Sequence, residues 1–294
     1  MGTDARHHDQ VLSGSMRRDE WNQRPLRYRL GPPTPLAVRV LGGPVHALVR
    51  IVHRASAEGW EHLPADGPYL LVANHPPCLG SGEFFSFMAL WVRRFGATRP
   101  LAGFTHVSAH AVWPMPWLFR QIGAIPSTYA AAEDALARGI PIAVFPGGDH
   151  EAFQPFWRRG ADFHRREGFL AIAREAGVPI VPMGIRGQSA PVLWRSHVLA
   201  WLAIWPRFTG VKRFGLTVLG VLGAAAILCL PLPWYGRAVL ACSWALSPFA
   251  LFSWLPTRTH VRIGGPMPSS STSPEVERAV AALLQTAGGS ISRS

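Results

Sequence analysis

The sequence predicts an α/β fold in which helices flank a mostly parallel central sheet, with an amphipathic N-terminal helix and a hydrophobic helical hairpin added. Apolar runs at 69–73, 140–145 and 178–185 have the length and aliphatic content of buried strands. A helical pattern at 165–176 lies between the last two runs, and a strand, helix, strand order implies a parallel sheet with a right-handed crossover. The apolar stretch 214–255 predicts the hairpin.

We expect five segments along the chain. Residues 35–56 show apolar residues at helical spacing, interrupted by arginines such as Arg39 and Arg50 and by a Gly-Gly-Pro kink at 42–44. A core helix and a helix lying on a membrane surface both fit this pattern. The segments are a flexible arm (1–34), the amphipathic helix (35–56), the α/β domain (57–210), the hydrophobic hairpin (211–257), and a strand and helix that complete the domain (258–294).

The apolar stretch 214–255 is divided into two halves by residues 235–237. Each half is near the lower limit of the ~17 to 25 residues that cross a bilayer. The cations Lys212, Arg213 and Arg258 flank the stretch on one side, as expected for a hairpin that enters a membrane and returns. A pair of buried helices in a soluble domain is the alternative, and spanning and dipping both remain open for a membrane hairpin.

The charge of the chain points to anionic partners. The formal net charge is +12 and the pI is near 11.1, almost entirely from arginine, because Lys212 is the only lysine. Guanidinium groups bind phosphate in bidentate fashion, which favours lipid headgroups and phosphorylated substrates. We expect no nucleic-acid partner, since the sequence has no lysine-rich tail, basic recognition helix or aromatic platform.

The cysteines and histidines give no metal or disulfide pattern. Cys78, Cys229 and Cys242 share no ligand spacing, so we expect a reducing compartment, no bound metal and no disulfide framework. The first residues lack the apolar segment of a secretory signal, so we do not expect export.

A histidine follows the first predicted strand. Asn74 and His75 end the run 69–73, and prolines and glycines then prevent regular structure. Ligand crevices of open α/β sheets lie at the carboxyl ends of strands, which makes His75 a candidate general base. A hydrogen-bonded structural histidine beside a turn is the alternative. The strand at 140–145 delivers a second loop, which begins at Pro146.

The two loops together resemble the glycerolipid acyltransferase superfamily, and in particular its monoacylglycerol and diacylglycerol acyltransferase-like branch. Asn74-His75 match the first motif of that superfamily, which includes the lysophosphatidic acid acyltransferases, and Phe145 to Glu151 match the Pro-Gly-Gly form of a later one. Arg166, Gly168-Phe169 and residues 178–182 match the pattern downstream. The resemblance covers residues 57–190.

The resemblance implies a glycerol-phosphate acyltransferase-like fold and an O-acyltransferase of phospholipid or glycerolipid metabolism. Such an enzyme moves a fatty acyl group from acyl-CoA or acyl carrier protein to a hydroxyl of a glycerolipid or lysophospholipid. It needs no bound cofactor, and we expect it at the cytoplasmic face of the inner or plasma membrane, with membrane lipids as partners. A catalytically inactive lipid-binding or scaffold protein of the same fold is the alternative.

The resemblance also implies roles for individual residues. His75 is the base, and the Gly147-Gly148 backbone can approach a phosphate or the oxyanion closely. Arg165 and Arg166 can hold a substrate phosphate, or can instead pair with Asp162 or Glu167. Ser127, beside Thr128, is also a possible helix cap. The expected substrate-binding residues are Asn74, Ser127, Pro146, Gly147, Gly148, Asp149, Glu151, Arg165 and Arg166.

One departure concerns the residue that orients the histidine. Gly80 stands where the superfamily has an aspartate, five residues after His75. Glu83 is the nearest carboxylate, and we expect the glycine-rich loop to fold it back onto His75. This would give the imidazole the acidic partner that the motif otherwise lacks.

Two other chemistries receive less support. Cys78 lies three residues after His75, so a Cys/His nucleophile is conceivable, although a small buried cysteine is the commoner explanation. Residues 187–190, Gly-Gln-Ser-Ala, lack the final glycine of a nucleophile elbow, which argues against a serine hydrolase.

Overall fold

A single sheet of seven strands forms the centre of the described chain. The computed structural model describes residues 28–79, 81–111, 113–158, 160–203, 212–252 and 255–285. The strand order is β1-β9-β6-β2-β5-β3-β4, and all neighbours are parallel except the antiparallel pair β6 and β9. The predicted fold class is therefore confirmed. The strands are β1 (Ser56–Glu58), β2 (Leu70–Ala73), β3 (Ala102–Thr105), β4 (Ala124–Pro126), β5 (Ile142–Val144), β6 (Ile180–Arg186) and β9 (His260–Ile263).

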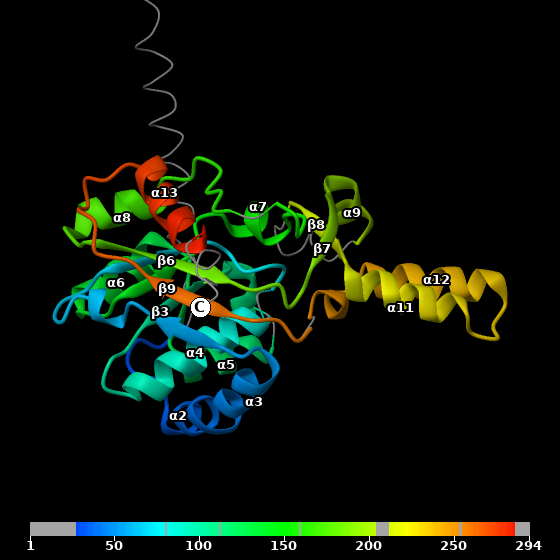
Figure 1. Ribbon diagram of the computed structural model, residues 1–294, viewed down its shortest axis with the longest axis horizontal. Helices are drawn as coiled ribbons and strands as arrows, with labels where there is room; N and C mark the ends of the chain where they lie inside the picture. The colour runs from blue at the N-terminus through cyan, green and yellow to red at the C-terminus, as the bar shows by residue number, and fades with distance from the viewer. Residues whose placement is uncertain are drawn as a thin grey trace, which may run out of the picture.

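Helices cover both faces of this sheet (Figure 1). Leu70 and Val72 of β2 pack with α6 (Tyr129–Ala137), α8 (Gly168–Ala176) and α13 (Ser273–Gln285) on one face. Leu71 and Ala73 pack with Phe87 and Trp91 of α4 (Ser81–Phe95) on the other. Because successive residues of a strand point to opposite faces, a strand buried on both sides is apolar throughout, which is why the sequence shows β2 as an unbroken run.

The order of the strands places two loops next to each other. The predicted strand, helix, strand unit is β5, α8 and β6, but β2 lies between β5 and β6 and pairs with both. All three strands run in the same direction, so their carboxyl ends meet at one edge of the sheet. This arrangement brings His75, which follows β2, beside the loop that follows β5.

The N-terminal helix runs along the outside of α4. It consists of α2 (Pro35–Val40), a π-helical turn η1 (Leu41–Val45) where a kink was predicted, and α3 (His46–Val52). Leu41 packs with Val92, and Val49 packs with Ala89 of α4, whereas the side chain of Ile51 is 78% exposed. The helix is therefore amphipathic. Among the described residues, the stretch Pro35–Val52 is the one helix whose length and hydropathy alone would allow it to cross a bilayer.

The helix begins at Pro35 as expected, but it is shorter than expected at its other end. It ends at Val52 rather than at residue 56, because Ser56 already pairs in β1. The arm predicted at 1–34 lies mostly outside the described residues. Its last part contacts the domain: Tyr28 Oη donates to Asp134 Oδ2 (3.3 Å), and the Thr34 side chain caps α2.

The hydrophobic hairpin is shorter than predicted. Phe214–Thr217 forms strand β8, which pairs antiparallel with β7 (Val192–Ser196) in a small second sheet followed along the chain by the hairpin. The hairpin helices are α11 (Val218–Leu228) and α12 (Trp234–Ala245), with 11 and 12 residues. At 1.5 Å per residue each is about 17 Å long, too short to cross a hydrocarbon core of about 30 Å. The hairpin projects from the α/β domain (Figure 1).

The remaining elements complete the domain. The C-terminal strand and helix lie where the sequence predicted them, as β9 and α13. The other short elements are η2 (Trp60–His62), η3 (Val107–Ala111), α5 (Met115–Ile122), α7 (Gly148–Ala152), α9 (His197–Leu202) and η4 (Pro248–Leu251).

Candidate active site

His75 lies at the carboxyl end of β2 with one ring nitrogen already bound. Its Nδ1 is 2.6 Å from the carbonyl oxygen of Pro76, so the proton resides on Nδ1 and Nε2 is left as an acceptor. The edge of the ring packs near Phe145, with the ring centroids 5.7 Å apart. A backbone carbonyl thus orients the imidazole, which is the task that the sequence had led us to expect of a carboxylate.

The surroundings of His75 keep the imidazole neutral. Crowding by protein atoms, which removes solvent from the ring, lowers its pKa below the usual value of 6.5. The hydrogen bond to Pro76 and the charge of Asp149 oppose this shift, and the charge of Arg166 adds to it. A neutral imidazole with a bare Nε2 is the form that can accept a proton.

Glu83 does not have the predicted role. Helix α4 begins at Ser81 and includes Gly82, so Glu83 stands in the first turn of a helix rather than in a flexible loop. One carboxylate oxygen accepts from the Ser189 backbone N–H and the other from the Ser189 hydroxyl, both at 2.7 Å. The pairing with a residue 106 positions away fastens α4 to the loop after β6. Gly80 itself lies outside the described residues.

Asn74 and Glu151 hold the backbone around His75. The Asn74 amide donates to Ile185 O (2.9 Å) and accepts from Ile185 N (2.7 Å), which ties the end of β2 to β6. Glu151 accepts from the backbone N–H of His75 (2.7 Å) and of Asp162 (3.1 Å). Both were expected to bind substrate, and the structure gives both side chains protein partners instead.

Burial raises the pKa of Glu151 to about 8, although its two backbone hydrogen bonds act in the opposite direction. The side chain is 5% exposed. A Cβ on Gly147 would collide with this carboxylate, which explains one glycine of the pair.

Arg166 is paired with an acid rather than free. Its guanidinium donates to Asp149 Oδ1 (2.7 Å) and to the carbonyl oxygen of Pro146 (3.2 Å). Burial would raise the pKa of Asp149, but the hydrogen bond and charge of Arg166 outweigh it and hold the pKa below its usual value. The guanidinium also fills the space beside Gly148, whose φ of +47° favours glycine. The alternative pairings with Asp162 and Glu167 are wrong for Arg166.

The other predicted residues divide between the site and its borders. Gly148 N donates to Phe145 O (3.1 Å), which leaves Gly147 as the better candidate of the two for an oxyanion. Ser127 follows β4 at the edge of the sheet, and its neighbour Thr128 caps α6. Arg165 is exposed on the loop before α8. Of the predicted substrate-binding residues, Asn74 and Glu151 line the cavity at His75. Those outside its lining are Ser127, Pro146, Gly147, Gly148, Asp149, Arg165 and Arg166.

Cys78 has the environment of a structural cysteine. It is buried, and its Sγ lies 3.7 Å from the carbonyl oxygen of Ala190. Burial raises the pKa of the thiol, with a further contribution from the charge of Glu83, so the thiolate is scarce at neutral pH. These contacts favour a structural role for Cys78 over a Cys/His nucleophile.

A cavity of about 600 Å³ opens at His75. Its wall includes three arginines that the sequence reading did not select: Arg158, Arg186 and Arg258. The signal that could have found two of them is position, because Arg186 ends β6 and Arg258 lies two residues before β9. The other lining residues are Asn74, Pro77, Glu151, Gln154, Pro155, Gly160, Ile185, Gly187, Gln188, Thr257, Ala281, Leu284 and Gln285.

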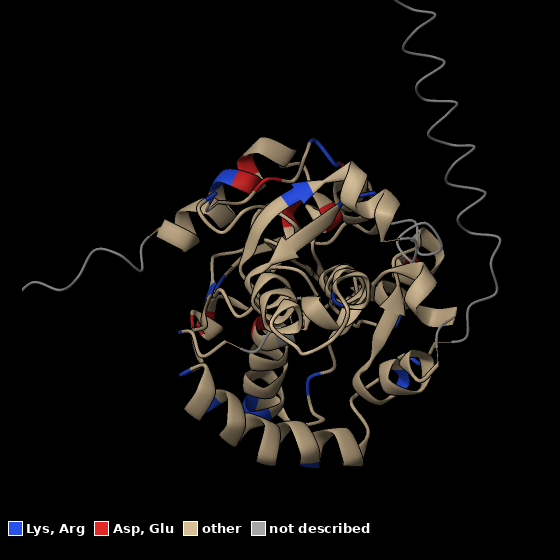
Figure 2. Cartoon of the chain, turned by 90° about the vertical axis from the view of Figure 1, so that its right-hand side faces the viewer, with Lys and Arg blue, Asp and Glu red and all other residues tan. Residues whose placement is uncertain are grey.

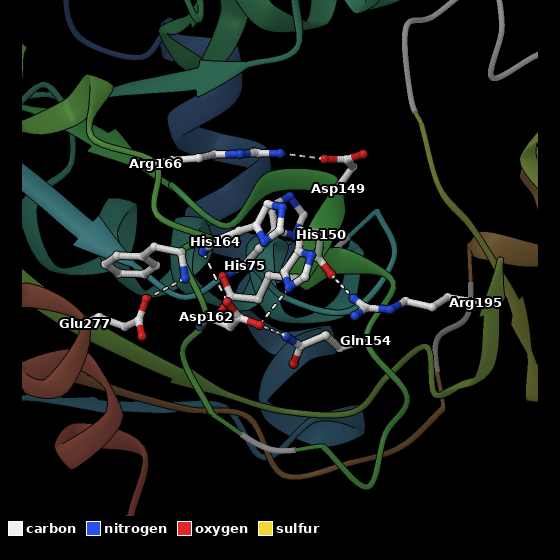
Figure 3. Close-up of polar contacts among 11 residues, drawn as sticks. His75, Asp149, His150, Gln154, Asp162, His164, Arg166, Arg195 and Glu277 are labelled. Carbon is white, nitrogen blue, oxygen red and sulfur yellow. Dashed lines mark hydrogen bonds and ion pairs between the residues drawn. The ribbon is translucent and has the colours of Figure 1, made fainter. Parts of the chain in front are cut away.

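Two histidines and an aspartate form a group that includes His150 of α7 (Figure 3). His150 Nε2 is 2.6 Å from Asp162 Oδ2, which also accepts from Gln154, and the ring of His164 stacks on that of His150. One ligand atom from each of His150, Asp162 and His164 lies within 4.8 Å of the others, a spacing that can hold a metal ion. The sequence reading missed this grouping, and its expectation of no metal stays a prediction.

Comparisons with known proteins give one family match and several relatives. Residues 54–186 match the family described as Acyltransferase. An uncharacterized protein of Mycobacterium leprae is 30% identical over 206 residues, which is 65% of this chain and 52% of the relative. A human protein, "DGAT1/2-independent enzyme synthesizing storage lipids", is 28% identical over 134 residues, or 45% of this chain and 39% of the relative. The chain spans about half the length, or less, of these relatives.

A solved structure is similar as well. The 1-acyl-sn-glycerophosphate acyltransferase PlsC of Thermotoga maritima has a TM-score of 0.48 and 15% sequence identity over 87% of this chain and 81% of that one. The strand-end histidine and the loop after β5 both fall inside the matched range 54–186. The family match over residues 54–186 and the human relative support the resemblance to the glycerolipid acyltransferase superfamily.

Proposed function

We propose that this protein transfers a fatty acyl group from a thioester to a hydroxyl of a glycerolipid or lysophospholipid, with His75 as the general base. The observation that carries the proposal is the imidazole itself. Its Nδ1 is held by Pro76 O, its pKa is lowered, and it lines the cavity at the sheet edge.

The reaction needs no covalent intermediate on the protein. His75 Nε2 accepts the proton of the acceptor hydroxyl while that oxygen attacks the thioester carbonyl. The tetrahedral intermediate then collapses, the C–S bond breaks, and the imidazolium returns the proton to the departing thiolate. The Gly147 backbone N–H is our candidate donor to the oxyanion.

The acyl donor is acyl-CoA or an acyl carrier protein, and the acceptor is a membrane lipid. The human relative is named for the synthesis of storage lipids, and the Pro-Gly-Gly loop of this chain favours the monoacylglycerol and diacylglycerol branch. We include lysophospholipids because the chain shares only part of that relative's length. The reaction requires neither a resident metal nor a redox cofactor.

The protein acts at a membrane surface, and we place it on the cytoplasmic face. Most of the exposed side chains of the hairpin are apolar, and Figure 2, which looks along the hairpin, shows few charged residues in it. Because its helices are too short to cross, the hairpin dips into one leaflet. The exposed apolar face of the helix at 35–52 gives a second contact with the interface.

The test is a transfer assay with the full chain in vesicles. Labelled acyl-CoA and acyl carrier protein are each offered with lysophosphatidic acid, lysophosphatidylcholine, monoacylglycerol and diacylglycerol. We expect a labelled ester product from at least one pair. No product from any pair, together with vesicle binding, would instead support the catalytically inactive lipid-binding protein.

A further inference from the structure

Three segments far apart in the sequence deliver an arginine to the cavity at His75. Arg158 lies on the loop after α7, Arg186 is the last residue of β6, and Arg258 lies two residues before β9. The antiparallel pairing of β6 and β9 sets Arg186 opposite His260, so the start of β9 lies beside the end of β6. The one antiparallel pair of the sheet therefore adds a cation to the edge where the parallel strands end.

The positive charge of this cavity is not neutralised within the described chain. Glu151 is the only acid among the lining residues described, and its two oxygens accept backbone N–H groups. Its raised pKa also removes part of its charge at neutral pH. Within the described ranges, no ion pair is found for the side chains of Arg158, Arg186 or Arg258. Arg166, by contrast, is bound to Asp149.

The cavity also offers neutral groups that form hydrogen bonds. Gln154, Gln188, Gln285 and Thr257 line it. The Oε1 atom of Gln188 is buried and has no hydrogen-bond partner among the described residues. A buried acceptor of this kind calls for a donor, such as a hydroxyl or an amide N–H of a ligand.

We propose that this cavity binds the phosphate groups of a substrate, with Arg158, Arg186 and Arg258 as the binding residues. The inference rests on the proposed function and assigns the phosphate contacts to residues other than Arg165 and Arg166. Guanidinium groups bind phosphate oxygens in pairs of parallel hydrogen bonds, and the volume of about 600 Å³ is within the usual range for a ligand site. His75 lines the same cavity, so a ligand held there by its phosphate can present its reacting group to the imidazole.

Two substrates carry this chemistry. Coenzyme A has a diphosphate and a 3′-phosphate, and a lysophosphatidic acid acceptor has a phosphate monoester. Acyl-pantetheine and monoacylglycerol are the matched substrates without phosphate. Comparing each pair distinguishes a donor site from an acceptor site.

The experiment uses the full chain in vesicles with Arg186→Gln, Arg258→Gln, the double variant and the control Arg138→Gln. Arg138 is exposed directly after α6 and pairs with Asp134, so the control removes the same charge away from the cavity. Thermal unfolding is compared first, so that only variants with the melting temperature of the wild type are used.

We expect each cavity variant to raise KM for one phosphate-bearing substrate by about tenfold, because hydrogen bonds to a charged group are lost. A rise in KM for acyl-CoA but not for acyl-pantetheine identifies a donor site. A rise for lysophosphatidic acid but not for monoacylglycerol identifies an acceptor site. Equal KM values for the double variant and the Arg138→Gln control would overturn the proposal.

Direct binding separates this proposal from the proposed function. Binding of free coenzyme A and of glycerol 3-phosphate is measured by calorimetry, which requires no turnover. If no acceptor is acylated but the double variant still binds one of these ligands about tenfold or more weakly, the phosphate site stands and the acyl transfer fails. If neither ligand binds the wild type, the phosphate site is wrong.

Discussion

The α/β domain buries its large apolar side chains, whereas the α11–α12 hairpin exposes them. In the domain, strands β2, β5 and β6 bury their aliphatic residues against helices. In the hairpin, α11 buries Gly220 and α12 buries Ala241, while the large side chains face outward. The exposed set is Val221, Leu222, Leu228, Leu230, Leu232, Trp234, Tyr235, Val239 and Leu240.

The two regions also differ in how they use charge. Asp149, Glu151 and Arg166 form hydrogen bonds that shape the loop at His75. The hairpin helices contain one charged residue, Arg237, whose guanidinium donates to the carbonyl oxygen of Leu228 (2.9 Å) at the end of α11. The guanidinium thus provides a donor to a carbonyl group at the end of α11, where a positive charge is also favourable. Under the proposed function, the chemistry and the membrane contact therefore lie in separate regions, and substitutions in each can test one without the other.

The largest effect is expected for His75→Ala. Removal of the base should lower kcat for acyl transfer by about 10³-fold, while binding to vesicles stays unchanged. The measurement is the initial rate with labelled acyl-CoA, alongside a vesicle flotation assay. Transfer at the wild-type rate would show that another group accepts the proton.

The opposite pattern is expected for Leu222→Glu and Leu240→Glu. Each removes an exposed apolar side chain and adds a charge, so vesicle binding should weaken by about tenfold per site. Cosedimentation with vesicles gives the partition coefficient. The rate with a detergent-dispersed acceptor should be unaffected. The control is the conservative Leu222→Met, and unchanged binding of the glutamate variants would mean that the hairpin does not enter the membrane.

Glu83→Ala tests stability within the domain. It leaves the buried N–H and hydroxyl of Ser189 without an acceptor, so the free energy of unfolding should fall by about 2 to 3 kcal/mol. Denaturant unfolding in detergent measures this. Glu83→Gln should leave the transfer rate per folded molecule unchanged, and Ser189→Ala completes a double-mutant cycle. A large loss of kcat in Glu83→Gln with stability intact would restore the orienting role.

Glu151→Gln should change how stability depends on pH. The folded protein keeps the Glu151 proton up to a pKa of about 8, whereas the unfolded chain loses it near the ordinary value of 4.5. The stabilisation is therefore complete below pH 4.5 and is lost as pH rises toward 8, by up to about 1.4 kcal/mol per pH unit. A plot of the free energy of unfolding against pH should therefore be flatter for the variant over this range. Identical slopes would contradict the raised pKa.

The smallest effect concerns the acid limb of activity. Since the pKa of His75 is lowered, kcat/KM should fall only below pH 6.5. Asp149 acts to raise that pKa, so Asp149→Asn should move the midpoint further down. Rates from pH 4.5 to 8 measure both midpoints. A midpoint above 6.5 in the wild type would mean that the imidazole is not desolvated as described.

Several elements followed from local pattern and were found as predicted. A strand (His260–Ile263) and a helix (Ser273–Gln285) lie within the segment 258–294 where they were expected, and His75 follows β2 as expected. Each depends on periodicity and capping within a few residues. Phe214–Thr217 was assigned to the hairpin instead, because four apolar residues read alike in a helix and in a strand whose partner, β7, lies some twenty residues earlier.

The site itself was only partly predictable. The sequence indicated the two loops, but not that β2 lies between β5 and β6 or that Glu83 meets Ser189. It also missed Arg158, Arg186 and Arg258, since each is an ordinary surface arginine until the strands are placed in order.

By itself the sequence determined the α/β class, the strand-end histidine and the two-part hydrophobic segment, because each is a local pattern of side chains along the backbone. Only the tertiary structure decided which groups those side chains meet. His75 receives a backbone carbonyl in place of a carboxylate, and Arg166 receives Asp149 in place of a substrate. Partners of this kind depend on strand order and on contacts across many residues, which periodicity does not encode.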